Sequence, residues 1–117
     1  MVIAIYVYRV RRDAVGQFLR IHEQAKRILL ELGVLDLRLY AASDLAPKYG
    51  CTSFIEALAV EEDEAIYLEL DEFRDPAHMT DVMARVDRDG RIATLFRALK
   101  SIVQLQRAVR GEFQRVS

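Results

Sequence analysis

A chain of 117 residues, 52% hydrophobic and 30% charged with a formal net charge of −1, has the size and composition of one globular domain spanning residues 1–117. The apolar fraction excludes a disordered tail, and charges recur too often for a membrane span. One cysteine and two histidines leave no disulfide and few zinc ligands, so we expect no metal and no cofactor. Basic residues follow the apolar start, the reverse of a secretory signal, and predict a cytoplasmic protein without membrane contact.

The charges are unevenly distributed along the chain. Residues 56–75 contain nine acidic residues and one basic residue, whereas the segments on either side carry more basic than acidic residues. A protein that binds nucleic acid without sequence preference needs a contiguous basic face that several phosphates can reach. A nearly neutral chain with an acidic centre does not favour such a face, so we expect no nucleic-acid partner.

The first third of the chain predicts a strand, a long helix and a second strand. Val2–Tyr8 is an unbroken run of β-branched, aromatic and small apolar residues, typical of a strand covered on both faces. From Asp13 to Leu32 apolar residues recur at helical spacing, with Asp13 as the expected N-cap and Gly33 as the expected end. Leucines then alternate with polar and aromatic residues over Leu35–Ala41, which predicts a strand with one apolar face.

The middle of the chain predicts a loop, an undecided segment and a third strand. Residues 43–52 contain proline and glycine and indicate a surface loop. Residues 54–60 fit either a short helix or an extended piece, because their periodicity favours neither. Residues 65–73 alternate between an apolar and a polar face, which predicts a third strand.

The last third predicts two helical segments and a final strand. Asp75 followed by Pro76 is typical of a helix start, because the aspartate satisfies a free backbone amide and the proline needs no donor. Gly90 interrupts this helix, and a second apolar stripe at helical spacing begins at Ile92. The short mixed segment 108–113 is the expected fourth strand.

The predicted order is strand, helix, strand, strand, helical region, strand, which is the split βαβ pattern of a ferredoxin-like domain. We therefore expect an α+β fold, a four-stranded antiparallel sheet with helices on one face. The other face then needs a second cover, and an identical chain is the simplest one. Two such sheets packed across a two-fold axis form a closed barrel with a small lumen between protomers, so we predict a homodimer that forms a dimeric α/β barrel.

The alternating strands carry polar and aromatic side chains that we expect to share one face and point into this lumen. An isolated charge in an apolar enclosure is costly, so Arg38 needs Glu69, Asp71 or a bound anion as its partner. In the alternative interpretation, Arg38 and Glu69 form only an interface ion pair that holds two subunits in register. The set consists of Asp36, Arg38 and Tyr40 in the second strand, Tyr67, Glu69 and Asp71 in the third, and Tyr6 and Tyr8 in the first; the ligand-binding candidates among them are Arg38, Tyr6, Tyr40, Tyr67 and Asp71.

Two residues are candidates for catalysis. His22 lies toward the apolar side of the first helix, where a neutral imidazole could act as general base toward a substrate held between helix and sheet. Glu69 is the second candidate base. In the alternative interpretation, His22 is simply packed in the core.

Several short motifs resemble a known family. They are Thr52-Ser53-Phe54, Ala57, the acidic run Glu61–Glu64, Pro76-Ala77-His78, Asp81, Val82, Met83, Arg85 and Asp89-Gly90-Arg91. Together they resemble the YbaA-like bacterial family of unknown function, in the dimeric α/β-barrel superfamily, although the segment from Leu99 to Arg107 departs from that family's Pro-Phe-Asp-Gly stretch. The resemblance implies the fold and the dimer but no established activity. Relatives in the superfamily include cofactor-free monooxygenases, haem-degrading enzymes, lactone isomerases and ligand-binding regulatory domains.

The sequence supports three hypotheses about function. The first is a cytoplasmic homodimer that binds a small aromatic or anionic molecule in the lumen, with Arg38 contacting the anionic group. The second is a cofactor-free enzyme, similar to a monooxygenase or an isomerase, that uses His22 or Glu69 as base and tyrosines to position the substrate ring. The third is a structural or partner-binding module without a small-molecule ligand.

Overall fold

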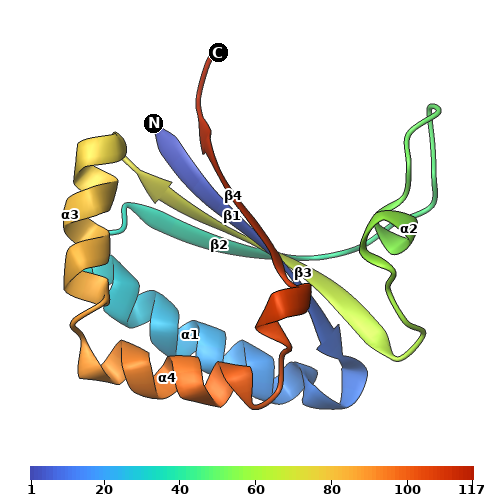
Figure 1. The fold of residues 1–117 in the computed structure, drawn as a ribbon, viewed down its shortest axis with the longest axis horizontal. Helices are drawn as coiled ribbons and strands as arrows, with labels where there is room; N and C mark the ends of the chain where they lie inside the picture. The colour runs from blue at the N-terminus through green and yellow to red at the C-terminus, as the bar shows by residue number, and fades with distance from the viewer.

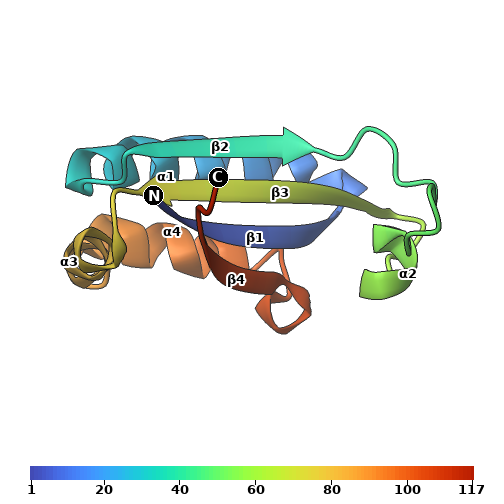
Figure 2. The ribbon, with the colours of Figure 1, turned by 90° about the horizontal axis from the view of Figure 1, so that it is seen from above.

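The computed structural model describes residues 1–117 and contains a four-stranded antiparallel sheet with helices packed on one face (Figures 1 and 2). The strand order is β2-β3-β1-β4, which is the order of the ferredoxin-like fold and confirms the predicted fold class. The two long strands β1 (Val2–Arg11) and β3 (Glu64–Phe73) form the centre of the sheet. The shorter strands β2 (Asp36–Ala41) and β4 (Val109–Gln114) form its edges.

Three helices make the covering layer. Helices α1 (Val15–Leu32) and α4 (Gly90–Lys100) run side by side along the sheet, and α3 (Pro76–Val86) stands at one end of it (Figure 1). The Asp75 side chain accepts a hydrogen bond of 2.7 Å from the backbone N–H of His78, as the N-cap prediction requires. Asp89 caps α4 in the same way, so the break at Gly90 starts a new helix with its own cap.

The start of α1 differs from the prediction that Asp13 is its N-cap. A 3₁₀ turn, Arg12–Ala14, precedes the helix, and Ala14 occupies the N-cap position without a side-chain cap. The Asp13 carboxylate instead accepts two hydrogen bonds from the guanidinium of Arg11, at 3.0 and 3.1 Å. Strand β1 continues three residues beyond its predicted end because Arg11 pairs with Glu64, and the tight turn that follows places Asp13 outside the helix.

The end of α1 depends on Gly33, whose φ of 121° favours glycine. A Cβ atom at this position would lie 2.8 Å from Nη2 of Arg85 and 3.0 Å from Cγ2 of Val82. Arg85 also donates a hydrogen bond from Nε to the carbonyl of Leu32 at 3.0 Å. Gly33 therefore ends α1, as predicted from the sequence. It also lets α3 approach α1 closely.

The undecided segment after the loop is a short helix, α2 (Phe54–Leu58). The Ser53 hydroxyl accepts a hydrogen bond from the backbone N–H of Ile55 and caps it. Figure 2 shows α2 at the far end of the sheet, away from the other helices. A 3₁₀ turn, Leu105–Arg107, leads into β4, which lies one residue beyond its predicted position at both ends. No helix is long and apolar enough to cross a membrane.

Two buried clusters fill the space between the sheet and the helices. One lies toward α3 and includes Phe73 and Val82, and the other surrounds Phe18 of α1. Tyr6 packs against both clusters. The space between the clusters is where the core is incomplete, and the polar residues of β1 and β3 lie there.

The opposite face of the sheet has an apolar centre, with Asp36, Arg38 and Glu72 toward the β2 edge, and, away from α2, no helix lies on it (Figure 2). Because directly paired residues share a face, the register places Ile3 beside Phe113 and Ile5 beside Leu70 on this side. Phe113 is 56% exposed, and the neighbouring Val109 is also exposed. We call this surface, formed by Ile3, Ile5, Leu68, Leu70, Val109 and Phe113, the open face.

Candidate functional site

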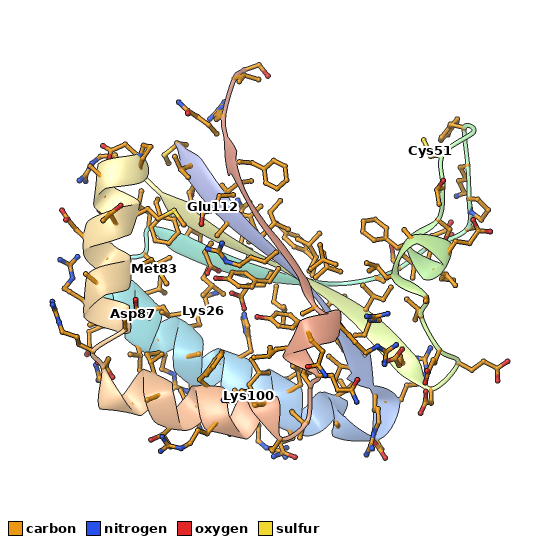
Figure 3. All side chains as sticks on the ribbon, viewed as in Figure 1. Lys26, Cys51, Met83, Asp87, Lys100 and Glu112 are labelled. Atoms are coloured by element: carbon orange, nitrogen blue, oxygen red, sulfur yellow. The ribbon has the colours of Figure 1, made fainter.

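A pocket of about 400 Å³ lies between the covered face of the sheet and helices α1, α3 and α4. Thirteen of its seventeen lining residues are hydrophobic, and the other four are all acidic: Glu69, Asp71, Asp87 and Asp89. Figure 3 shows Asp87 and Met83 on the side of α3 that faces β4, where the pocket continues into a more open groove reaching Glu112. The pocket therefore combines apolar walls with groups of one charge sign.

The pocket exists because the middle of α4 does not pack on the sheet, although Ile92 and Leu99 contact the two core clusters. Its apolar residues recur at helical spacing, yet α4 has no buried residue, and Phe96 remains 48% exposed. The helix instead packs along α1, where Arg91 donates to the Glu31 carboxylate at 2.7 Å. Leu95 and Phe96, in the middle of α4, consequently face a space that no side chain fills.

The floor of the pocket comes from the two central strands. Side chains alternate along a strand, so Tyr6 and Tyr8 of β1 share a face with Glu69 and Asp71 of β3. The register pairs Tyr6 with Glu69, and the rings of Tyr6 and Tyr8 stack with centroids 6.0 Å apart. Tyr67 shares this face but lies beside Phe18, with ring centroids 5.2 Å apart, and does not line the pocket.

The two carboxyl groups of the floor hold protons more tightly than ordinary carboxyls. Burial raises the pKa of Glu69 well above its usual range, and repulsion from Asp71 raises it further. Burial also raises the pKa of Asp71 to about 6, although a hydrogen bond from Glu69 and the charge of Arg110 oppose the rise. The two groups therefore titrate as a pair, and their burial favours a form in which one proton lies between the two carboxyls.

His22 extends from α1 toward the floor, but Glu69 lies between His22 and the pocket. Its Nε2 lies 3.5 Å from Oε1 of Glu69, has no hydrogen-bond partner and is buried. Burial lowers the pKa of His22, and Lys26 lowers it further, so the imidazole is neutral at pH 7. Because His22 is not part of the pocket lining, Glu69 and Asp71 are the acid–base groups that a bound molecule would meet.

Arg110 of β4 is the basic residue beside the floor. It pairs with Tyr6 in the sheet register, and its guanidinium lies 5.2 Å from the centroid of the Tyr6 ring. The same guanidinium forms an ion pair with Glu112 at 2.8 Å. Arg110 was not singled out from the sequence because the short, mixed segment 108–113 gives no signal of which face its side chains take.

The prediction that Arg38 and Tyr40 share a face with Tyr6, Tyr67, Glu69 and Asp71 is wrong. The register of β2 and β3 pairs Leu39 with Glu69 and Leu37 with Asp71, so the leucines of β2 join the covered face. Arg38 and Tyr40 therefore point to the other side, where Arg38 pairs with Asp36 at 3.3 Å and both side chains are half-exposed. Leu37 is fully buried in the core, and this burial decides which face of β2 turns toward the helices.

The expected position of the site is corrected as well. The tyrosines and carboxyls lie beneath the helices of a single protomer, and the face left for a second sheet is the apolar open face. That α4 lines the site could not be predicted from the sequence, because apolar residues at helical spacing, such as Leu95 and Phe96, usually pack in the hydrophobic core. Cys51 is exposed on the loop far from the pocket (Figure 3).

The fold and the pocket define a class, ferredoxin-like α+β proteins with a cavity between sheet and helices. Solved structures with this fold include a NIPSNAP family protein of unknown function from Agrobacterium tumefaciens, with a TM-score of 0.65 and 14% identity over 99% of this chain and 94% of the other. An antibiotic biosynthesis monooxygenase gives 0.63 and 10% over the full length of both chains. An uncharacterized NIPSNAP domain protein from Burkholderia xenovorans gives 0.62 and 13%, covering 100% and 96%. At these identities the similarity shows a shared fold.

The sequence itself places the chain in a family. Residues 1–100 match the DUF1428 family, described as a protein of unknown function, and the chain belongs to it. The match ends at Lys100, within the segment where the chain was expected to depart from its resemblance. The name YbaA-like stays a prediction. No curated protein matches the sequence.

Proposed function

We propose that the protein binds a small, mainly apolar molecule in the pocket between its sheet and helices. The observation that supports this most is α4, an amphipathic helix without a buried residue: Ile92 and Leu99 pack against the core clusters, and Leu95 and Phe96 between them line the pocket. A helix that leaves its apolar side uncovered gives up stabilisation that a closed core would provide. A ligand that fills the pocket would restore that burial.

An aromatic ligand suits the walls. Tyr6 and Tyr8 offer stacked rings at the floor, and Phe96 offers a third ring from α4. The anionic ligand expected from Arg38 is not supported, because Arg38 lies on the other face and the four charged residues of the lining are acidic.

A neutral aromatic probe tests the proposal. We expect indole to bind and to change the chemical shifts of the methyl groups of Met83 and Leu95. Two-dimensional NMR would measure these changes. Ala93→Phe places a ring inside the pocket and should abolish binding, whereas Thr94→Phe, on the neighbouring position outside the lining, should leave it intact. Equal binding by both variants, or no binding by the wild-type protein, would contradict the proposal and favour the structural or partner-binding module.

We also propose that the protein forms a homodimer through its open face. On the open face, exposed Val109 and Phe113 continue into half-buried Ile3, Ile5, Leu68 and Leu70. A contiguous apolar patch is rare on monomers, and a second copy offers the same apolar surface. Arg38 and Asp36 sit side by side on the same face, so a two-fold axis can place each beside its opposite charge. We expect a sedimentation mass twice the chain mass of 13.5 kDa. Phe113→Asp should yield monomers, Tyr49→Asp on the exposed loop should not, and a monomeric wild type at micromolar concentration would refute the dimer.

Proton transfer without a cofactor is a second candidate function, favoured by the His22–Glu69 contact at 3.5 Å. A carboxyl pair that shares one proton can take a proton from a carbon acid and return it, with neutral His22 positioning Glu69. We expect the protein to accelerate deuterium exchange at the α-carbon of 2-tetralone, a neutral bicyclic ketone. NMR would measure the rate of this exchange. Asp71→Asn should abolish the acceleration, and His78→Gln, remote from the pair, should not. Exchange at the uncatalysed rate would exclude this activity for the probe.

A further inference from the structure

We propose that the pocket takes a small hydrophobic amine, whose ammonium group the Glu69–Asp71 pair holds at the floor. The inference rests on the proposed function, because it names the chemical class of the ligand for the same pocket. It also reverses the expectation of an anionic ligand. The observations that carry it are the lack of a cationic partner for this pair, the acidic lining and the aromatic walls.

The first observation is an unpartnered group. Asp71 is only 6% exposed and lines the pocket, and its Oδ1 is buried without a hydrogen-bond partner. Neither Asp71 nor Glu69 forms an ion pair with a lysine or arginine. Glu69 hydrogen-bonds to Asp71, and its other polar neighbour is His22 at 3.5 Å, whose imidazole is neutral. A buried carboxylate without a cation or a full set of donors is unfavourable, so such a group points to a missing partner.

A third buried acid on the same strand shows what a completed site looks like. Glu64 is as buried as Asp71, and its carboxylate accepts hydrogen bonds from both terminal nitrogens of Arg107, at 3.3 and 3.4 Å. It also accepts a hydrogen bond from the backbone N–H of Glu61 at 2.9 Å. The protein therefore neutralises one buried acid internally and leaves the pair that faces the pocket without a cation.

The charges around the pair leave the pocket negative. Among them, Asp89 is paired with Arg91 at 2.8 Å, and Arg110 is paired with Glu112 at 2.8 Å. Asp87 has no ion-pair partner and lines the pocket with the floor pair, so its charge adds to theirs. The charged and titratable groups that face the pair are Tyr6 and Tyr8 from β1, His22 from α1, Asp87 from the end of α3, Asp89 from the start of α4, and Arg110 and Glu112 from β4. The charge of Lys26 in α1 acts on His22, and Lys26 does not line the pocket.

An ammonium group supplies what the pair lacks. Its three N–H donors can reach both carboxyls, and charge-assisted hydrogen bonds are stronger in a pocket with little water. Tyr6 and Tyr8 line the pocket beside the pair, and the apolar walls accept the hydrocarbon part of the amine. A carboxylate ligand would meet like charge instead, and a neutral alcohol would satisfy the hydrogen bonds without offsetting the charge.

Three probes with one ring and different end groups test the ligand class. Calorimetry at pH 7.5 would compare phenethylamine, phenethyl alcohol and phenylacetate. We expect the amine to bind about tenfold or more tightly than the alcohol, and phenylacetate to bind most weakly. Asp71→Asn should remove the preference for the amine while leaving the alcohol bound, and Glu69→Gln should weaken the preference. The matched control Asp81→Asn, on the exposed side of α3, should change nothing.

The outcomes separate this inference from the proposed function. If the alcohol binds as well as the amine, or if Asp71→Asn keeps the preference, the amine class is wrong and the pocket still binds small apolar molecules. If Asp87→Asn alone removes the preference, the cation site lies at Asp87 and the floor assignment is wrong. If none of the three probes binds, both the inference and the proposed function fail.

Discussion

Strand β3 carries buried acids at two places, and the two places differ in what surrounds them. At one end Glu64 is held by Arg107 and a backbone N–H, so its charge and its hydrogen-bonding capacity are satisfied. Five and seven residues further along the strand, Glu69 and Asp71 lie beside each other without a cation and next to a pocket. A satisfied buried acid supports the fold, whereas an unsatisfied pair stores unfavourable energy that a ligand can relieve.

The largest effect should come from breaking the satisfied site. Arg107→Ala leaves Glu64 buried without its cation, and removing one partner of a buried pair costs about 2 to 4 kcal/mol of unfolding free energy. Urea denaturation at pH 7 measures the loss. Arg115→Ala near the exposed C-terminus is the control and should change stability by less than about 0.5 kcal/mol. A loss as small as that of the control would mean that Glu64 does not need Arg107.

Neutralising the unsatisfied pair should have the opposite sign. The pKa of Asp71 is about 6 in the fold against 3.8 for a free aspartate, so the folded state binds the proton more tightly than the unfolded chain. The contribution of Asp71 to stability is therefore largest below about pH 4 and is lost as the pH rises from about 4 through about 6. We expect Asp71→Asn to be more stable than the wild type by about 1 to 3 kcal/mol at pH 8, since a shift of two units is worth about 3 kcal/mol.

The pH dependence provides the check on this stabilisation. Thermal unfolding of Asp71→Asn and of the wild type should differ clearly at pH 8 and converge near pH 4, where Asp71 is protonated in both states. A variant that is less stable than the wild type at pH 8 would show that an unseen partner already satisfies Asp71.

Coupling between the two carboxyls should be smaller and measurable. Glu69→Gln and Asp71→Asn each remove one member of the pair that shares a proton, so the double variant should gain less than the sum of the single gains, by about 1 kcal/mol. The double-mutant cycle in urea at pH 8 measures this difference. Additive gains would mean that the two carboxyls do not share a proton.

The smallest effect should be at Arg38, which the sequence had placed among the pocket residues. Its pair with Asp36 is half-exposed, and such pairs contribute between zero and about 1 kcal/mol. In monomeric protein, for example in the Phe113→Asp background, Arg38→Ala should change unfolding free energy by less than about 0.5 kcal/mol and leave indole binding unchanged. Loss of indole binding in this variant would mean that Arg38 contributes to the pocket after all.

Much of the architecture could be read from local patterns. The caps at Asp75 and the stop at Gly33 act within a few residues, so the sequence shows them directly. Alternation along β1 and β3 correctly grouped Tyr6, Glu69 and Asp71 on one face. The N-cap at Asp13 failed because the length of β1 depends on its partner, and Arg11 pairs with a residue more than fifty positions away.

The sequence by itself determined the order of the elements, the fold class and the chemical groups available to the site, because periodicity and capping are local properties of the chain. Only the tertiary structure decided which face of each strand meets the helices and where the core stays open. Leu37 and Leu39 take the covered side of β2, which sends Arg38 and Tyr40 to the other face. The gap beneath α4 arises because that helix packs on α1 rather than on the sheet, and no pattern within Gly90–Lys100 encodes that choice.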